Sequence, residues 1–144
     1  MEVSLAEQTR AKLAWQSGLR FSAESGSGHG LTVDSVARPG HAGPGPMELI
    51  LVGIAGCTAM DVVSILEKLR QPLSGLDVDI VGDRAEQHPK RLTAITITYR
   101  VRGEGLERDK VERAVELSHS TYCSAVASLR EDCKVTTSIE IIEA

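Results

Sequence analysis

Residues 46–70 read PMELILVGIAGCTAMDVVSILEKLR. The run from Leu49 to Met60 is apolar except at Thr58, a pattern typical of a helix that is buried on nearly all sides. Pro46 suits the first turn of a helix, because its missing N–H would have no partner there. We therefore predict a long central helix from about Met47 to Arg70.

This helix is expected to need a second subunit. Small residues within it would let another backbone approach closely, namely Gly53, Ala55, Gly56 and Ala59. A chain of 144 residues rarely surrounds so long an apolar helix by itself. The apolar run is too short to span a bilayer and is flanked by Glu48 and Asp61, so no membrane association is expected. We predict that a partner covers part of the helix.

The rest of the chain alternates between strand and helix patterns. Apolar residues at 95, 97, 99 and 101 alternate with polar ones, which predicts a strand in an antiparallel sheet with one face in water. The other predicted elements are two or three short strands within 10–36, strands at 76–81 and 135–142, and a helical region at 107–130 interrupted near 118–121. This order predicts a single α+β domain over residues 1–144.

One segment is expected to be irregular. Residues 37–46 read ARPGHAGPGP, with three prolines and three glycines, and no regular element survives that composition. It is either a flexible connector or a loop over a site, since long loops in compact domains are often functional.

Composition narrows the function classes. The net charge is −4, aromatic residues make up 3% of the chain, and there is no basic block, so a nucleic-acid partner is not expected. The first ten residues lack a secretory apolar segment, which predicts a cytoplasmic protein. Thiols are kept reduced there, so the three cysteines are not read as a disulfide framework.

Two cysteines are the candidates for chemistry, although a buried cysteine is usually only a small hydrophobe. Cys57 lies in the middle of the long helix, too far from its start for the helix dipole to activate it. Cys123 would sit in the first turn of a new helix if Ser120 or Thr121 capped it, and the dipole would then lower its pKa. Cys133 is interpreted as structural.

A metal site is also considered for these cysteines. His119 lies four residues before Cys123 and, with Cys57, would offer zinc three suitable ligands. No spacing signature supports such a site, so neither a metal nor another cofactor is expected. Asp61 follows Cys57 by four residues and shares its helical face. Its charge would raise the thiol pKa unless it pairs with a basic residue or caps the dimer contact, and its role stays open.

Four short motifs lie along the chain, namely PMEL at 46–49, GC at 56–57, DVVSIL at 61–66 and YCS at 122–124. Together they resemble the OsmC/Ohr family of thiol peroxidases. The resemblance runs from about Lys12 to the C-terminus. It implies an intertwined homodimer with the two long helices packed at its centre and the sites at the subunit interface.

The resemblance also implies a reaction. Cys57 would attack an organic hydroperoxide and become a sulfenic acid, and Cys123 would condense with it to form a disulfide. A dithiol reductant would then restore the thiols. This agrees with general thiol chemistry, because sulfenic acids condense readily with nearby thiols.

Two further residues are carried over from the family. A glutamate directly after the proline orients an arginine on the reactive cysteine in well-studied members, but here Met47 follows the proline and Glu48 comes next. Arg20 is the nearest match for the arginine, with Arg38 as a second choice. Glu48 precedes Cys57 by nine residues on the opposite helical face, so it would act only across the dimer or through another residue.

The displaced glutamate motivates an alternative function. The chain would then be a non-catalytic dimeric stress or binding protein that keeps the scaffold and buries its thiols. The separation of the two sulfur atoms discriminates between the two hypotheses, because a disulfide needs them close together.

Overall fold

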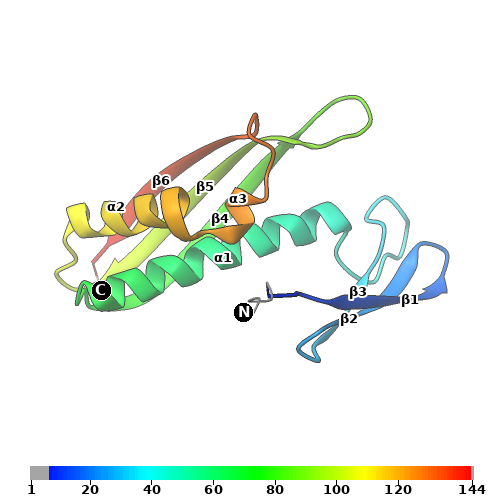
Figure 1. Cartoon of the computed structure of the whole chain (residues 1–144), viewed down its shortest axis with the longest axis horizontal. Helices are drawn as coiled ribbons and strands as arrows, with labels where there is room; N and C mark the ends of the chain where they lie inside the picture. Colours follow the sequence, from blue (N-terminus) through cyan, green and yellow to red (C-terminus); the bar gives the residue numbers. More distant parts are fainter. Residues whose placement is uncertain (1–6, 144) are drawn as a thin grey trace, which may run out of the picture. The chain divides into compact units, whose positions relative to one another are not determined.

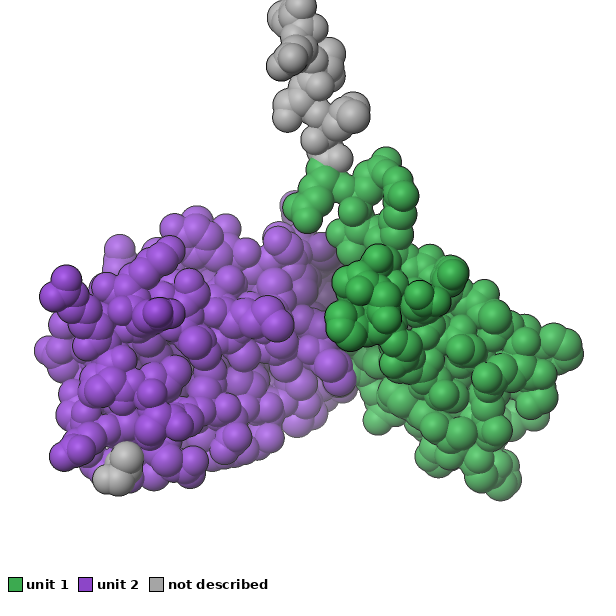
Figure 2. All heavy atoms as spheres, turned by 90° about the horizontal axis from the view of Figure 1, so that it is seen from below, with its two compact units in different colours: residues 1–49 green, residues 50–144 purple. Residues whose placement is uncertain are grey.

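The computed structural model describes residues 7–143, and the chain divides into two compact units with the boundary after Leu49 (Figure 2). The boundary falls inside helix α1 (Pro46–Lys68), close to its start. Each unit is therefore described by itself, and the expectation of one domain over residues 1–144 stays a prediction.

Unit 1 is a small antiparallel sheet in the order β1-β2-β3 (Figure 1). Its strands are β1 (Ala11–Ser17), β2 (Arg20–Ser25) and β3 (Gly30–Val33). The prediction of two or three short antiparallel strands within residues 10–36 is thus confirmed, with three strands present. Gly18 and Gly28 adopt positive φ in the two connecting turns, where residues with a Cβ would be strained.

Unit 2 contains the rest of α1 and a three-stranded sheet in the order β4-β5-β6 (Figure 1). Its further elements are β4 (Leu73–Arg84), β5 (Leu92–Gly103), α2 (Arg108–Leu117), the π-helical turn η1 (Ser118–Tyr122), α3 (Ser124–Ala127) and β6 (Lys134–Ile142). The predicted break near residues 118–121 is confirmed by the π-helical turn. Figure 1 shows α1 and α2 on the same face of this sheet.

The core of unit 2 lies between this sheet and its helices. The alternating apolar residues of β5 are almost fully buried, as the sequence pattern predicts, and they are Ile95, Ile97, Tyr99 and Val101. The α+β prediction with antiparallel pairing is confirmed for β4 and β5. β6 differs, because it pairs with β5 in parallel. The helices between β5 and β6 carry the chain back across the sheet, which is the connection that parallel neighbours require.

Within the described residues of one chain, helix α1 buries a single face, so its burial on nearly all sides stays a prediction that depends on a second subunit. The buried face carries Ile54, Thr58, Val62, Ile65 and Leu66. Large apolar side chains elsewhere on the helix are exposed, namely Ile50, Val52, Met60 and Val63. With 23 residues, α1 is long and apolar enough to cross a bilayer, although the apolar run at 49–60 is too short. A helix in a protein core can have the same length and composition, and the buried face of α1 packs on a sheet.

Candidate active site

The two candidate cysteines lie side by side in unit 2. The sulfur atoms of Cys57 and Cys123 and a carboxylate oxygen of Asp61 all lie within 4.8 Å of one another. Both thiols are free. A disulfide bond is about 2.05 Å long, so the two sulfurs need to approach by less than about 3 Å to form one. Cys57 is half-buried, whereas Cys123 is only 3% exposed.

Cys123 is held by the start of helix α3. It is itself the N-cap residue, and its Sγ accepts a hydrogen bond from the N–H of Val126 at 3.4 Å. The expected caps, Ser120 and Thr121, lie instead in the π-helical turn.

The expected lowering of the Cys123 pKa is wrong. Burial raises the pKa of the Cys123 thiol, and the hydrogen bond from Val126 offsets that only in part, while the neighbouring Cys57 raises it further. Helix α3 has four residues and offers little dipole to counter the burial. Cys123 therefore stays protonated at neutral pH, and Cys57 is the more accessible of the two thiols.

A buried chain of hydroxyl groups extends from the Asp61 carboxylate into the core. Ser118 donates to Asp61 Oδ2 at 2.8 Å and shares a 2.9 Å hydrogen bond with Thr58. Thr58 in turn bonds the Tyr99 hydroxyl at 2.7 Å, and burial raises the pKa of Tyr99. The chain joins α1, η1 and β5, and it fixes the Asp61 carboxylate beside the sulfurs. Sequence reasoning missed it, although Thr58 was the one polar interruption of the apolar run.

A cavity of about 280 Å³ opens next to this cluster. It is lined by Asp61, Ser64, Ile65, Lys68, Leu69, Leu117 and Tyr122. Asp61 follows Cys57 by one helical turn, and Tyr122 precedes Cys123 directly, so the cavity adjoins both cysteine-bearing segments. Three aliphatic side chains and the Tyr122 ring give it an apolar wall, which suits a small molecule with an organic group.

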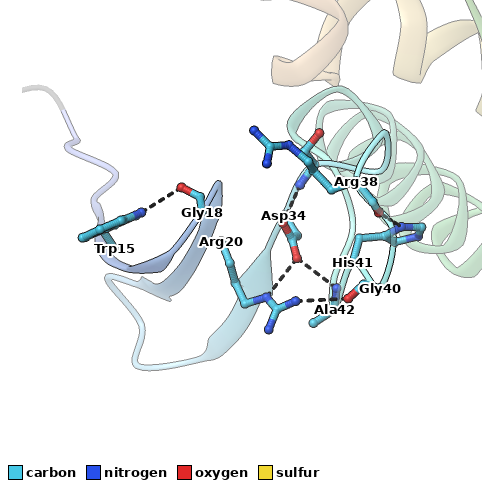
Figure 3. Close-up of polar contacts among 9 residues, drawn as sticks. Trp15, Gly18, Arg20, Asp34, Arg38, Gly40, His41 and Ala42 are labelled. Atoms are coloured by element: carbon cyan, nitrogen blue, oxygen red, sulfur yellow. Dashed lines mark hydrogen bonds and ion pairs between the residues drawn. The ribbon is translucent and has the colours of Figure 1, made fainter.

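Arg20 is anchored within unit 1 by a residue that the sequence analysis missed (Figure 3). Its Nε donates to Asp34 Oδ2 at 2.9 Å, and its Nη2 donates to the Gly40 carbonyl at 3.1 Å. Asp34 is 5% exposed and also accepts from the backbone N–H groups of Ala42 and Ser35. The Ala42 N–H, followed by the Arg20 guanidinium, lowers the pKa of Asp34 to about 2.

These contacts also hold the segment at residues 37–46. Asp34 donates its N–H to the Pro44 carbonyl, and a Cβ at Gly43 would collide with the Thr32 carbonyl. The segment is thus fastened at several points, which argues against a freely flexible connector. Whether it lies over a site stays a prediction.

Glu48 has a different partner from the one expected. Its Oε1 accepts a hydrogen bond from the N–H of Gly45 at 3.0 Å, the residue directly before α1. This is the glutamate half of a capping box, in which the third helical residue reaches back to the N-cap N–H. Arg20 pairs with Asp34 rather than with Glu48. How Arg20 and Glu48 act on the thiols of unit 2 therefore stays a prediction.

Two other candidates lie outside the cluster. His119 contributes no atom to the cluster of Cys57, Asp61 and Cys123. Burial lowers the pKa of the His119 imidazole, which keeps it neutral. Cys133 is buried just before β6, and its pKa is raised by burial and then by Asp132. Cys133 remains interpreted as structural.

Comparison with known proteins supports the resemblance. The sequence profile of the family described as OsmC-like protein matches residues 39–138. The chain belongs to the OsmC family.

Individual relatives and solved structures match over nearly the whole chain. Protein YhfA of Escherichia coli K12 is 38% identical over 135 residues, covering 94% of this chain and 99% of YhfA. A hypothetical protein from Aquifex aeolicus is 31% identical, with a TM-score of 0.86 over 96% of this chain and 99% of its own. An organic hydroperoxide resistance protein from Legionella pneumophila shares the fold, with a TM-score of 0.71 at 18% identity over 95% and 99% of the two chains.

Proposed function

We propose that this protein is a homodimeric thiol peroxidase that reduces organic hydroperoxides. The observation that carries the proposal is the Cys57–Cys123 pair, two free thiols within 4.8 Å in a chain of the OsmC family. The Legionella protein of the same fold, named for hydroperoxide resistance, supports the choice of substrate class.

The burial of the two thiols supports their division of labour. Cys57 is half-buried and accessible, so it is the nucleophile. Its sulfur attacks one peroxide oxygen, the O–O bond breaks, and the organic fragment leaves with a proton as an alcohol. Cys57 is then a sulfenic acid. The apolar cavity beside Asp61 would receive the organic group of the substrate.

Cys123 is the resolving thiol. Its sulfur attacks the Cys57 sulfenic acid, an S–S bond forms, and the oxygen leaves as water. Its burial and raised pKa keep it as a thiol until Cys57 has been oxidised. An external dithiol then reduces the disulfide by exchange and is itself oxidised to a disulfide.

Arg20 is proposed as the cation that favours the Cys57 thiolate, as the family resemblance suggests. Its anchor on Asp34 would hold the guanidinium in a fixed orientation, with Glu48 acting on the start of α1 through Gly45. An opposite charge near a thiol lowers its pKa. Arg20→Lys should therefore retain part of the activity, whereas Arg20→Met should lose most of it.

The homodimer proposal rests on the open face of α1. Gly53 and Gly56 meet nothing within 4 Å that an added Cβ would touch, so nothing in the described chain accounts for their small size. A second α1 packed there would. Gly56→Leu should then convert dimer to monomer in sedimentation at micromolar concentration, while Val81→Leu on exposed β4 should not. A Gly56→Leu protein that dimerises as the wild type does would contradict this interface.

The enzyme assay follows peroxide consumption with a dithiol present and a chelator in the buffer. Wild type and Cys133→Ser should consume an organic hydroperoxide at equal rates, and Cys57→Ser should lose the activity. Cys123→Ser should accumulate a sulfenic acid that a dimedone-type reagent traps. If wild type and Cys57→Ser both consumed peroxide only at the background rate, the protein would instead be a non-catalytic binding protein. The uncompensated charge of Asp61 beside the thiols favours that alternative.

A further inference from the structure

The Asp61 carboxylate is not explained by peroxidase chemistry. It lies within 4.8 Å of both sulfurs, and a negative charge there disfavours a thiolate. Within the described part of the chain, Asp61 takes part in no ion pair, and its carboxylate accepts a hydrogen bond from the neutral Ser118 hydroxyl. A cation is what two thiols and an unpaired carboxylate would together stabilise.

We propose that Cys57, Asp61 and Cys123 form a binding site for one Zn²⁺ ion. Zinc accepts thiolate sulfur and carboxylate oxygen in tetrahedral sites, and one position would remain for water. Zn–S bonds of about 2.3 Å place two sulfurs about 3.8 Å apart, so the pair needs to close by about 1 Å from its 4.8 Å limit. Side-chain rotation of the half-buried Cys57 is sufficient for that.

The ligands are held by ordered elements. Cys57 and Asp61 lie one turn apart on α1, and Cys123 is fixed as the cap of α3 by the Val126 N–H. Ser118 orients the Asp61 carboxylate, as outer-shell hydrogen bonds do for metal-binding carboxylates. Asp61 also lines the cavity of about 280 Å³, which gives solvent access to the free coordination position.

Binding is a simple exchange. Two Zn–S bonds and one Zn–O bond form, any proton still on a ligand thiol leaves to solvent, and nothing is oxidised. Zinc binds the thiolate form of cysteine, whereas the sulfurs of a disulfide are neutral and joined to each other, so the disulfide and the metal exclude each other. Zinc would therefore bind only to the reduced form of the protein.

The test titrates reduced, chelator-treated protein with Zn²⁺ against a chromophoric chelator, without peroxide. Wild type should bind one Zn²⁺ per chain and release protons from its ligand thiols. Cys57→Ser and Cys123→Ser should each bind at least 100-fold more weakly, and Asp61→Asn and Ser118→Ala about 10–100-fold more weakly. Cys133→Ser, the matched cysteine control, should bind as the wild type does.

A second measurement avoids mutation. Wild type oxidised to the Cys57–Cys123 disulfide should bind no zinc, and reduction should restore one ion per chain. Co²⁺ in place of zinc should give thiolate-to-metal absorption in the reduced protein only. Equal zinc affinity in reduced and oxidised wild type, or a loss in Cys133→Ser as large as in Cys57→Ser, would overturn the site. Peroxidase activity does not enter this result, because neither titration contains peroxide.

Discussion

The two units of this protein are stabilised in different ways. Unit 2 has an aliphatic core, with residues such as Leu66 and Val62 fully buried between α1 and its sheet. Among the described residues of unit 1, the buried apolar side chains are Ala23 and Val33, while Leu13 is 57% exposed. Unit 1 has instead a nearly buried carboxylate, Asp34, which accepts hydrogen bonds from Arg20 and from two backbone N–H groups. The thiol pair thus lies in a unit with a packed core, and the proposed activating cation lies in a unit that needs cover from outside its own sheet.

The sharpest way to break this comparison is to remove core volume from unit 2. Leu66→Ala should lower the free energy of unfolding by about 2–5 kcal/mol, because it leaves a cavity in a packed interior. Urea unfolding of the reduced protein measures the change. The exposed Val81→Ala serves as the control and should stay within about 0.5 kcal/mol. Equal losses in both variants would contradict the core described for unit 2.

The next test concerns the hydroxyl chain that supports the site. Thr58→Val keeps the shape of the side chain but leaves the Tyr99 and Ser118 hydroxyls short of a buried partner. We expect a loss of about 1–3 kcal/mol, against about 0.5 kcal/mol or less for Thr96→Val on the exposed face of β5. Thermal or urea unfolding of the two variants side by side provides the measurement.

A smaller and concentration-dependent loss is expected in unit 1. If the second subunit covers its sheet, Leu13→Ala removes apolar area buried only in the dimer, worth about 1–2 kcal/mol. The loss should diminish as the protein is diluted below its dimer dissociation constant, whereas that of Leu66→Ala should not. A Leu13→Ala effect that is independent of concentration would show that the cover does not come from a second copy.

The smallest expected effect is a pH dependence centred on Asp34. Its pKa is lowered from 3.8 to about 2, so the folded state favours the carboxylate. The resulting stability is complete above about pH 4 and is lost as the pH falls toward 2. Asp34→Asn should flatten this part of the stability curve and speed amide exchange at Ala42, while Asp83→Asn on exposed β4 should leave both unchanged.

The sequence was informative wherever the signal was local. The apolar run after Pro46 predicted α1, alternation predicted the buried face of β5, and weak helix signals marked the break before Cys123. The parallel pairing of β6 was not predictable, because it depends on how α2 and α3 return the chain to the sheet.

The same distinction between local signals and long-range contacts applies to the candidate site. Motifs picked out Cys57 and Cys123, and the structure places their sulfurs together. The ion-pair partner of Arg20 was missed because Asp34 lies 14 residues further along the sequence, directly after the end of β3. The direction of the Cys123 pKa was missed because burial, a property of the whole fold, outweighs the short helix that it caps.

The most direct test of the account is to add one equivalent of an organic hydroperoxide to the reduced protein and map its disulfides by mass spectrometry. The account predicts an intrachain Cys57–Cys123 disulfide, formed faster than free cysteine is oxidised, with Cys133 still alkylatable. A protein in which neither Cys57 nor Cys123 is oxidised faster than free cysteine would contradict it, and the thiol pair would then be a feature of the fold without peroxidase function.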